Sequence, residues 1–360
     1  MKLLKFIKTI LGRKFRKPSV ANVAIVSDGG IGDCLCYLNY AKHLKQYCQD
    51  NIEIDFYTRI RCPESLYEPD DDYIRNFFQK SNIKHRFEKY DLVLWMQERF
   101  PKIRYIDILR LTKLQNSKLI EISKIYNSHY RKFKFFYDNS PRSDGYSAIL
   151  SLVIGKNRVT QPDICDLLHI KDFAINIPTT KDEVVLRKFS LLNQKYITIN
   201  RSVDSNKKQW ESTKLWPKSY NIELMKSLVS DYPGISFVYV GPKVENWLPQ
   251  GIINLSGNTT FEELKVLIKY AIVHIGPEGG MIHMRHILCR KPSIVLFGST
   301  SHEFYGYSEN FNISANNVCN GCEWMTENWS EQCLRNTGSS CKKLEAIHPN
   351  NVLEIISNII

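Results

Sequence analysis

Along the first hundred residues, short apolar runs alternate with segments whose apolar residues recur at helical spacing. The run at 22–27 (NVAIVS) has the length of a buried strand, the turn DGGIGD follows it, and residues 34–47 (CLCYLNYAKHLKQY) show helical periodicity. Residues 51–57 alternate like a second strand, and residues 90–96 (YDLVLWM) form a third apolar run, typical of a buried parallel strand. This alternation of strands and helices predicts a doubly wound α/β sheet.

A second series of strands begins beyond a polar boundary. The stretch 175–182 (INIPTTKD) is extended, polar and contains proline. After one helix, short apolar runs follow at 195–200, 235–240, 252–255, 271–275 and 293–297. We therefore predict two such sheets in tandem with a cleft between them: an N-terminal domain over 21–178, a boundary over 179–194 and a C-terminal domain over 195–360. Ligand sites of such sheets lie at the carboxyl ends of the strands.

Residues 1–20 have the pattern of a short basic amphipathic helix. Apolar residues recur at helical spacing between lysines and arginines in MKLLKFIKTILGRKFRK. Such a helix either lies on an anionic membrane surface or packs on its own protein. Lysines interrupt any apolar core and no small-residue cleavage site follows, so we do not expect a signal peptide. No apolar run is long enough to span a membrane.

The net positive charge of the chain predicts a negatively charged binding partner. The 360 residues carry a formal charge of +12, and 43% are hydrophobic, which is enough for folded cores. Nucleotide diphosphates, phosphorylated glycolipid, an anionic membrane and nucleic acid all satisfy this charge. Scattered cysteines without a secretory signal indicate a reducing cytoplasm, with the inner face of the cytoplasmic membrane as the alternative location. These cysteines are Cys34, Cys36, Cys48, Cys62, Cys165 and Cys289.

The stretch 100–145 is rich in lysine, arginine and aromatic residues, among them Tyr126, Tyr130, Lys132 and Phe135. It either binds a phosphorylated or sugar-bearing acceptor or forms a pair of helices with a solvated basic face. We favour the pair of helices.

The turn DGGIGD at 28–33 connects the first strand to its helix. Gly30 and Gly32 let the backbone turn tightly and approach a ligand, and we place this turn on the acceptor side of the cleft. Asp33 is a candidate general base that takes a proton from an attacking hydroxyl, although a carboxylate also suits the helix dipole there. A dinucleotide fingerprint fits poorly, because Leu35 stands where its third glycine would be.

A second glycine turn, PEGG, follows the fourth apolar run of the C-terminal series. Amide groups at the start of the next helix are suited to a pyrophosphate. The residues that open this helix are Gly279, Gly280 and Met281. Glu278, at the end of the strand, is a candidate acceptor for ribose or sugar hydroxyls. His283 lies one helical turn further on, where the sequence is equally consistent with a binding role and a structural one.

The segment KLWP at 214–217 opens another helix after the strand at 195–200. Lys214 is a candidate to neutralise the phosphates of a nucleotide. Arg201 and Ser202, at the polar end of the strand, are further candidates for the same binding site.

Taken in order, these segments resemble the lipopolysaccharide heptosyltransferase group of GT-B glycosyltransferases, family 9. The matching segments are IGD at 31–33, KLWP at 214–217, GNTTFEEL at 257–264, EGGMIH at 278–283 and PSIVLFGST at 292–300. Their order and spacing cover most of the chain, whereas residues 60–180 match poorly. The resemblance implies two Rossmann-like doubly wound domains that face a central cleft.

The resemblance also implies an inverting transfer without a catalytic metal. Asp33 would be the base, Lys214 and the helix start at 279–281 would hold the diphosphate, and Glu278 and His283 would line the donor site. The donor would be ADP-heptose. The acceptor would be a lipooligosaccharide, another glycan, or a serine or threonine of a protein. One departure is Glu278, where the family usually has aspartate.

Four further cysteines cluster near the C-terminus: Cys319, Cys322, Cys333 and Cys341. A C-x2-C pair followed by two more cysteines is typical of a tetrathiolate iron or zinc site. Two disulfides are disfavoured by a reducing compartment. A nucleic-acid-binding zinc ribbon is disfavoured by Glu323, Glu327 and Glu331, so no nucleic acid partner is expected. The cluster resembles the iron-binding finger of bacterial autotransporter heptosyltransferases. This resemblance implies a structural metal and leaves a homo-oligomer open.

Two other functions are alternatives to the transferase. One is a nicotinamide-dependent oxidoreductase that uses the first glycine turn and an acid such as Asp55. The other is a non-catalytic glycan- or partner-binding protein on the same scaffold. We favour the transferase, because the motifs supply a base, a pyrophosphate cradle and separate acceptor and donor domains.

Overall fold

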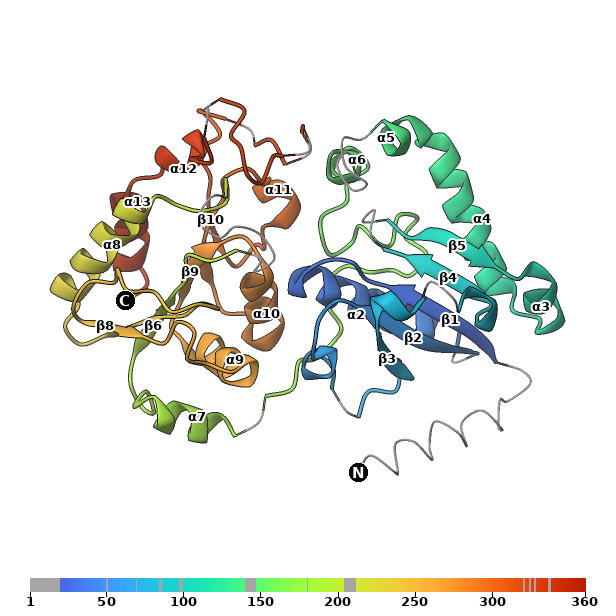
Figure 1. The fold of residues 1–360 in the computed structure, drawn as a ribbon, viewed down its shortest axis with the longest axis horizontal. Helices are drawn as coiled ribbons and strands as arrows, with labels where there is room; N and C mark the ends of the chain where they lie inside the picture. Colours follow the sequence, from blue (N-terminus) through green and yellow to red (C-terminus); the bar gives the residue numbers. More distant parts are fainter. Residues whose placement is uncertain are drawn as a thin grey trace.

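The computed structural model describes residues 20–49, 51–68, 70–83, 86–96, 100–139, 147–179, 181–203, 212–319, 321–323, 325–326, 328–335 and 338–360. The helix expected over 1–20 therefore lies outside the described residues, apart from Val20. Two lobes, each built on one sheet, lie side by side along the longest axis of the molecule (Figure 1). None of the described helices is both long enough and apolar enough to cross a membrane.

The N-lobe is built on a five-stranded sheet in the order β3-β2-β1-β4-β5. Its strands are β1 (Ala21–Val26), β2 (Ile52–Thr58), β3 (Asn76–Gln79), β4 (Leu92–Trp95) and β5 (Lys102–Ile106). The first four run parallel, and β5 runs antiparallel to β4. All residues of β1 are buried, as expected for a central strand covered on both faces. The strands predicted at 22–27, 51–57 and 90–96 are confirmed as β1, β2 and β4.

The hydrophobic pattern missed β3 and β5 because neither strand is buried. The two ends of β3 are exposed, and β5 lies at the sheet edge with every side chain at least partly exposed. The stretch 100–145, expected to be a pair of helices, therefore begins with an edge strand. Its described helices are α3 (Ile108–Lys113), α4 (Ser117–Lys132) and α5 (Lys134–Asp138).

Two other N-lobe helices lead to the junction with the second lobe. α2 (Ile31–Tyr47) starts directly after Gly30, whose backbone is extended, and it buries residues around its whole circumference. Such burial is expected because α2 packs on its own sheet and also on the other lobe. The short α6 (Ser147–Val153) precedes the segment that returns to this junction.

The C-lobe is built on a six-stranded parallel sheet in the order β11-β10-β9-β6-β7-β8. Its strands are β6 (Tyr196–Ile199), β7 (Ser236–Tyr239), β8 (Ile252–Asn254), β9 (His274–Pro277), β10 (Ser293–Leu296) and β11 (Phe311–Ile313). The predicted runs correspond to β6 through β10. β9 begins later than the run at 271–275, because Ala271 still caps the preceding helix with a hydrogen bond to Leu267.

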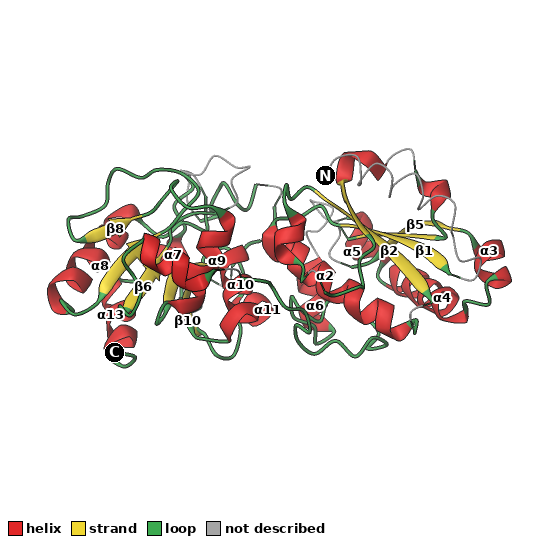
Figure 2. Cartoon of the chain, turned by 90° about the horizontal axis from the view of Figure 1, so that it is seen from below, coloured by secondary structure: helices red, strands yellow, loops and turns green. Residues whose placement is uncertain are grey.

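Helices cover both faces of the C-lobe sheet (Figure 2). They are α7 (Asp182–Lys188), α8 (Lys218–Asp231), α9 (Phe261–Tyr270), α10 (Gly280–Cys289), α11 (His302–Tyr305), α12 (Lys342–Glu345) and α13 (Pro349–Ser357). α9 starts with a reciprocal cap: the Thr260 hydroxyl accepts from the Glu263 amide at 3.2 Å, and the Glu263 carboxylate accepts from the Thr260 amide at 2.9 Å. α7 lies in the predicted boundary at 179–194 and packs on α9.

The two lobes share one apolar core where α2 packs on α10. Ile282 and Met284 of α10 belong to the same buried cluster as Leu35 and Leu38 of α2. The fully buried Lys265 of α9 adds a polar connection, because its ammonium donates to the carbonyl oxygens of Ser65 at 2.7 Å and Pro178 at 2.6 Å. The packing of α2 on α10 places the amino-terminal ends of these two helices next to each other.

Candidate active site

The first turns of α2 and α10 meet between the lobes. A Cβ atom on Gly32 would lie 2.4 Å from Cδ2 of His283, and one on Gly280 would lie 3.1 Å from Cβ of Ile31. Glycine at these two positions therefore lets the helix ends touch. Each helix end presents N–H groups without helical partners and a positive partial charge, so the junction is suited to an anion. The two glycine turns predicted to form one site are brought together here.

Asp33 lies at this junction in the first turn of α2. One carboxylate oxygen accepts a hydrogen bond from the Gly30 amide at 3.0 Å, and the other is paired with the guanidinium of Arg158. The Asp33 side chain is 30% exposed, whereas that of Arg158 is 2% exposed. The carboxylate therefore has a fixed orientation and is partly exposed.

Arg158 is a site residue that the sequence analysis missed. Its guanidinium lies 5.2 Å from the ring centroid of Tyr37 and donates to Gln161 at 3.0 Å. Its backbone amide donates to the carbonyl oxygen of Phe304 in the C-lobe at 2.8 Å. Arg158 thus connects Asp33 to both lobes. It belongs to the region 60–180, where no motif marks one arginine among 49 lysines and arginines.

Replacement of Arg158 by methionine should lower kcat by about tenfold with little change in donor affinity, because Asp33 loses its orientation. Steady-state kinetics and calorimetry with the donor check the two effects. The control is Arg187→Met, which removes an exposed arginine 3.6 Å from Glu183 and should leave both quantities unchanged. An unaltered kcat for Arg158→Met would separate this residue from Asp33.

Glu278 and Lys214 form an ion pair on the C-lobe side of the junction. Glu278 directly follows β9, and its side chain is 6% exposed, while that of Lys214 is 19% exposed. Gly279 caps α10 in an extended conformation, and Gly280 and Met281 open the helix. The expected phosphate-binding Lys214 therefore balances a carboxylate as well. Because a buried carboxylate needs such a partner, the pair fixes both side chains beside α10.

Arg201 and Ser202 lie on the same sheet edge as Glu278, because β6 and β9 are adjacent and parallel. Nε of Arg201 donates to the carbonyl oxygen of Trp216 at 2.7 Å. The Ser202 hydroxyl is hydrogen-bonded to the side-chain amide of Asn200. Both residues therefore have structural partners, and Arg201 positions the segment that carries Lys214.

His283 is buried one turn into α10, with 3% of its surface exposed. Its Nδ1 is hydrogen-bonded to the hydroxyl of Tyr307. Burial lowers the pKa of His283 to about 4, so the imidazole is neutral at physiological pH. The ring faces Gly32 across the junction. The binding role and the structural role that the sequence left open are therefore compatible in one side chain.

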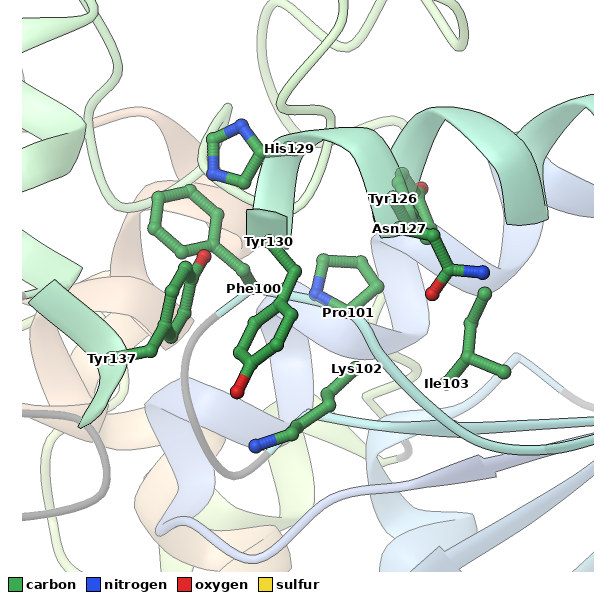
Figure 3. A pocket seen from close by; sticks show the side chains of 9 residues that line it. All are labelled: Phe100, Pro101, Lys102, Ile103, Tyr126, Asn127, His129, Tyr130 and Tyr137. Atoms are coloured by element: carbon green, nitrogen blue, oxygen red, sulfur yellow. The ribbon is translucent and has the colours of Figure 1, made fainter. Parts of the chain in front are cut away.

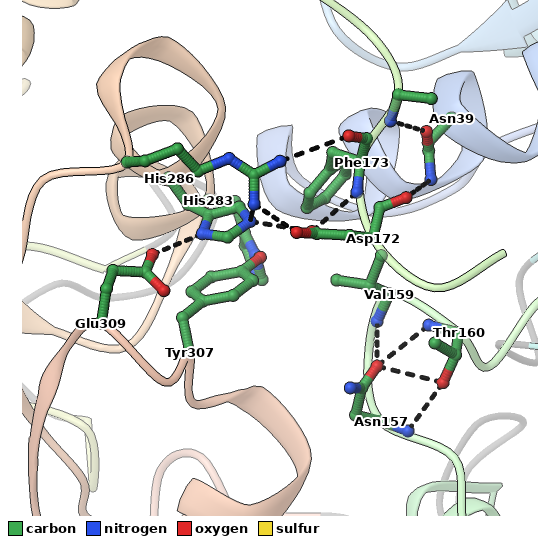
Figure 4. Close-up of polar contacts among 12 residues, drawn as sticks. Asn39, Asn157, Val159, Thr160, Asp172, Phe173, His283, His286, Tyr307 and Glu309 are labelled. Carbon is green, nitrogen blue, oxygen red and sulfur yellow. Dashed lines mark hydrogen bonds and ion pairs between the residues drawn. The ribbon is translucent and has the colours of Figure 1, made fainter.

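A histidine–carboxylate cluster fastens the lobes beside this site (Figure 4). His286 is 4% exposed; its Nδ1 is paired with Glu309 and its Nε2 with Asp172, the latter at 2.9 Å. The imidazole also stacks on Tyr307 with ring centroids 3.8 Å apart. Burial acts to lower the pKa of His286, but the hydrogen bonds that its ring donates to the two carboxylates outweigh it and raise the pKa. The carbonyl oxygen of Asp172 accepts from Asn39 of α2 at 3.1 Å, which completes the link between lobes.

This cluster predicts a pH dependence of stability. Because the pKa of His286 is raised in the folded chain, its ion pairs stabilise the fold fully below the unfolded pKa of about 6.5 and less as pH rises through the folded pKa. The stability lost in His286→Gln should therefore be largest in acid and shrink above neutral pH, as measured by urea unfolding. The control Asn39→Leu removes the hydrogen bond to the carbonyl oxygen of Asp172 at 3.1 Å without removing a titratable group, so its loss of stability should not vary with pH. A loss that is constant with pH would mean that His286 acts only through packing.

Asp55, the acidic residue of the oxidoreductase hypothesis, is not available to a ribose. Its carboxylate accepts hydrogen bonds from Arg75 at 2.9 and 2.7 Å, from Asn76 at 3.0 Å and from Tyr90 at 2.9 Å. Only 5% of Asp55 is exposed. The residue therefore belongs to a buried network of the N-lobe sheet.

An aromatic pocket opens at the edge of the N-lobe, between the start of β5 and the ends of α4 and α5 (Figure 3). Its volume is about 180 Å³. It is lined by Phe100, Pro101, Lys102, Ile103, Tyr126, Asn127, His129, Tyr130 and Tyr137. The Lys102 ammonium lies 5.1 Å from the ring centroid of Tyr130. Aromatic faces beside polar groups suit a sugar ring, so this part of the stretch 100–145 has the features expected of an acceptor site.

Basic side chains gather near the carboxyl edge of the same sheet, and we call Arg59, Lys80 and Arg104 the basic corner. Arg59 and Lys80 are ion-paired with Asp28, at 3.3 Å for Arg59. The Lys80 ammonium and the Arg104 guanidinium lie 5.2 and 5.7 Å from the ring centroid of Trp95. Arg59 and Lys80 are two cations on one carboxylate, and together they leave a positive charge next to the turn at 28–33.

One of the clustered cysteines, Cys322, packs against the loop that follows β10. Cys322, Cys333 and Cys341 are buried and Cys319 is half-buried. The Cys322 amide donates to the carbonyl oxygen of Ser299 at 2.9 Å, and the Ser299 hydroxyl accepts from Thr213, next to Lys214, at 2.8 Å. Within the described residues, no three His, Cys, Asp or Glu side chains are already grouped around one metal position. The finger therefore adjoins the donor side without entering it.

Comparisons with known proteins concern the family and the fold. Residues 166–337 match the sequence model of glycosyltransferase family 9 (heptosyltransferase). ADP-heptose lps heptosyltransferase II of E. coli is 14% identical, with 94% of this chain and 98% of that chain covered and a TM-score of 0.52. The iron-containing dodecameric glycosyltransferase TibC of enterotoxigenic E. coli is 14% identical, with 95% of this chain and 76% of that chain covered and a TM-score of 0.62. A family 9 glycosyl transferase of Veillonella parvula is 12% identical, with 96% of this chain and 98% of that chain covered and a TM-score of 0.56. These structures share the two-domain GT-B fold, and no curated protein sequence matches the chain.

Proposed function

We propose that this chain, a glycosyltransferase with a family 9 domain over residues 166–337, transfers a heptose from ADP-heptose to a hydroxyl of a glycan acceptor. The observation that carries the proposal is the junction of α2 and α10. In support of the proposal, the partly exposed Asp33 and the helix start at 279–281 belong to this one junction, and the Glu278–Lys214 pair adjoins that helix start. TibC was solved in complex with ADP-D-beta-D-heptose, which makes this donor the first to test.

The donor diphosphate would bind at the start of α10. The N–H groups of Gly280 and Met281 and the positive end of the helix dipole suit phosphate oxygens, and Lys214 is within reach of the same place through its pair with Glu278. Glu278 would accept hydrogen bonds from the sugar or ribose hydroxyls. The neutral ring of His283 would close the floor of this site.

Asp33 would act as the base of an inverting displacement. The acceptor hydroxyl gives its proton to the Asp33 carboxylate while its oxygen bonds to the anomeric carbon. The bond from that carbon to the diphosphate oxygen breaks, and ADP leaves with the electron pair. The charge on the leaving diphosphate would be stabilised by Lys214 and the α10 amides, so the proposal gives no metal a part in the transfer.

The acceptor would lie on the N-lobe. The basic corner supplies positive charge, and the aromatic pocket of Tyr130 and Tyr137 can hold a sugar ring. This combination favours a negatively charged glycan, such as lipooligosaccharide core, over a bare protein side chain. Such an acceptor would place the enzyme at the cytoplasmic face of the inner membrane.

A donor panel tests the proposal. Calorimetry with purified protein should show that ADP-heptose binds more tightly than GDP- and UDP-sugars, and mass spectrometry should show a heptose added to a glycan acceptor. Serine- or threonine-bearing peptides serve as the competing acceptor class. Transfer to peptide alone would overturn the glycan assignment. The absence of binding by any nucleotide sugar would favour the non-catalytic alternative.

A structural iron or zinc ion in the finger is a second part of the proposal. Four thiols are the ligand set that these ions prefer, three of the four are buried, and Cys322 is held to the carbonyl oxygen of Ser299. When bound, the ion would crosslink the finger. The corresponding self-association proposal, suggested by the dodecameric TibC, is tested by light scattering of the metal-loaded chain.

A further inference from the structure

One hydrogen bond at the junction of the two helices bears on the protonation of His283. The hydroxyl of Tyr307 is hydrogen-bonded to Nδ1 of His283, and among the described residues it has no other partner. Tyr307 is buried, and burial raises the pKa of its hydroxyl well above the ordinary value, so the hydroxyl keeps its proton. A buried O–H group without an acceptor is costly. Because Nδ1 is the acceptor within reach, the hydroxyl donates to it.

The direction of this hydrogen bond determines the other nitrogen of the ring. Burial lowers the pKa of His283 to about 4, so the imidazole is neutral at physiological pH and carries a single proton. The nitrogen that accepts a hydrogen bond leaves that proton to the other nitrogen. With Nδ1 accepting from Tyr307, the proton lies on Nε2. His283 is therefore a hydrogen-bond donor at Nε2.

Nε2 of His283 lies where the two helix starts touch. A Cβ atom on Gly32 would lie 3.1 Å from this nitrogen, and one on Gly280 would lie 3.4 Å from the amide nitrogen of Gly32. No described residue is hydrogen-bonded to Nε2, and this atom is not sealed from solvent although His283 as a whole is buried. The Nε2–H group therefore adds a donor to the N–H groups of both helix starts, which attract an anion.

Tyr307 is itself held by the cluster that joins the lobes (Figure 4). Its ring stacks on the imidazole of His286, with ring centroids 3.8 Å apart and an angle of 11° between the planes. Its carbonyl oxygen accepts from the side-chain amide of Asn312 at 3.0 Å and from the backbone amide of Asn310 at 3.1 Å. Stacking and backbone contacts together fix the hydroxyl beside Nδ1 of His283.

We infer that Tyr307 is a positioning residue that holds His283 in the tautomer with the proton on Nε2, so that Nε2–H donates to a phosphate oxygen of a nucleoside diphosphate at the junction. The tautomer is a property of the chain without ligand. The ligand half of the inference rests on the proposed function, because it requires the diphosphate at the start of α10. A neutral donor suits this place, since it stabilises phosphate charge without drawing Asp33 or Glu278 into an ion pair.

Nitrogen-15 NMR of the full-length chain with labelled histidine measures the tautomer directly. The two ring nitrogens of a neutral imidazole resonate far apart, and their positions show which one is protonated. The signals of His283 are those missing from the spectrum of His283→Gln. Wild type without ligand should have Nε2 protonated at neutral pH, and addition of ADP should shift the Nε2–H signal. A proton on Nδ1 in wild type would overturn the tautomer, and an Nε2–H signal unmoved by bound ADP would overturn the ligand half.

Tyr307→Phe tests the positioning role, because it removes the hydroxyl and keeps the ring that stacks on His286. In this variant a substantial share of His283 should change to the tautomer with the proton on Nδ1. The control is Tyr196→Phe, which removes another buried tyrosine hydroxyl of the C-lobe, one that donates to the carbonyl oxygen of Leu267 at 2.9 Å. It should leave the signals of His283 unchanged. Wild-type signals of His283 in Tyr307→Phe would show that Tyr307 does not set the tautomer.

Calorimetry with ADP measures the consequence for binding. Tyr307→Phe should weaken ADP binding by about two- to tenfold, the contribution of one hydrogen bond. In the His283→Gln background the same replacement should have no further effect, because Tyr307 acts through His283. Wild-type affinity in Tyr307→Phe, or an equal loss in both backgrounds, would overturn the ligand half. If wild type binds neither ADP nor ADP-heptose, the proposed function fails together with the ligand half, whereas the NMR measurement still decides the tautomer.

Discussion

Replacing Asp33 by asparagine should lower kcat/KM for sugar transfer by about 10²- to 10⁴-fold, the usual contribution of a general base. Asparagine keeps the size of the side chain and an oxygen that can accept from the Gly30 amide. It cannot take a proton from the acceptor hydroxyl. The affinity for ADP-heptose should remain near that of wild type, because the donor is held from the α10 side. Initial rates by mass spectrometry and donor binding by calorimetry check the two halves of this expectation.

The control for this variant is Asp71→Asn. Asp71 is also an aspartate of the N-lobe in an ion pair, 3.2 Å from Lys42, but it lies outside the proposed site. Its replacement should leave the rate of transfer unchanged. A wild-type rate in Asp33→Asn would show that another group takes the proton.

Loss of Lys214 should have the largest effect on donor binding. In Lys214→Ala, the dissociation constant for ADP-heptose should rise by about 10- to 100-fold, because a charged hydrogen bond to phosphate is worth about 1.5–3 kcal/mol. The variant also leaves the nearly buried Glu278 without its cation, and that carboxylate would then repel the diphosphate. Calorimetry with ADP-heptose and with ADP alone measures the change.

A double variant distinguishes the two causes. Lys214→Ala combined with Glu278→Gln should bind ADP more tightly than Lys214→Ala alone, because the repelling charge is removed. The control is Lys218→Ala. Lys218 is the first residue of α8, and its ammonium lies 5.1 Å from the ring centroid of Trp247. An equal loss of affinity in Lys218→Ala would mean that Lys214 contributes only to the overall charge of the lobe.

The buried strands could be predicted from the sequence because burial leaves a direct pattern. β1, β4 and β7 are apolar runs flanked by turns, and the helix α9 carries its reciprocal cap in the letters TFEE. β3 and β5 carry no such pattern, since edge position makes their burial partial. The stretch 100–145 was expected to be a pair of helices. Its first part is instead the edge strand β5, which forms one wall of the aromatic pocket.

The site could be predicted only as far as each motif is local. Both glycine turns, Asp33 and Glu278 stand in short ordered segments, and the structure brings these segments together. The partners of those residues come from distant parts of the chain. Arg158 meets Asp33 across 125 positions, and Tyr307 meets His283 from the loop before β11. Such contacts depend on how the lobes pack, and no spacing rule in a single sequence reveals them.

Lys343 illustrates the same limit in another way. In the sequence it is one of two adjacent lysines after a cysteine, and nothing distinguishes it from Lys342. Only the helical turn of α12 separates them, by directing one ammonium to solvent and the other to the interior. The two neighbouring lysines therefore have different surroundings.

A structure of the chain with bound ADP-heptose, or with ADP and an acceptor, tests the central claim most directly. Our account predicts the two phosphates at the amides of Gly280 and Met281, within reach of Lys214, with the anomeric carbon turned towards the open side of Asp33. A nucleotide found anywhere else, for example along the turn at 28–33 with its sugar directed away from Asp33, would contradict it.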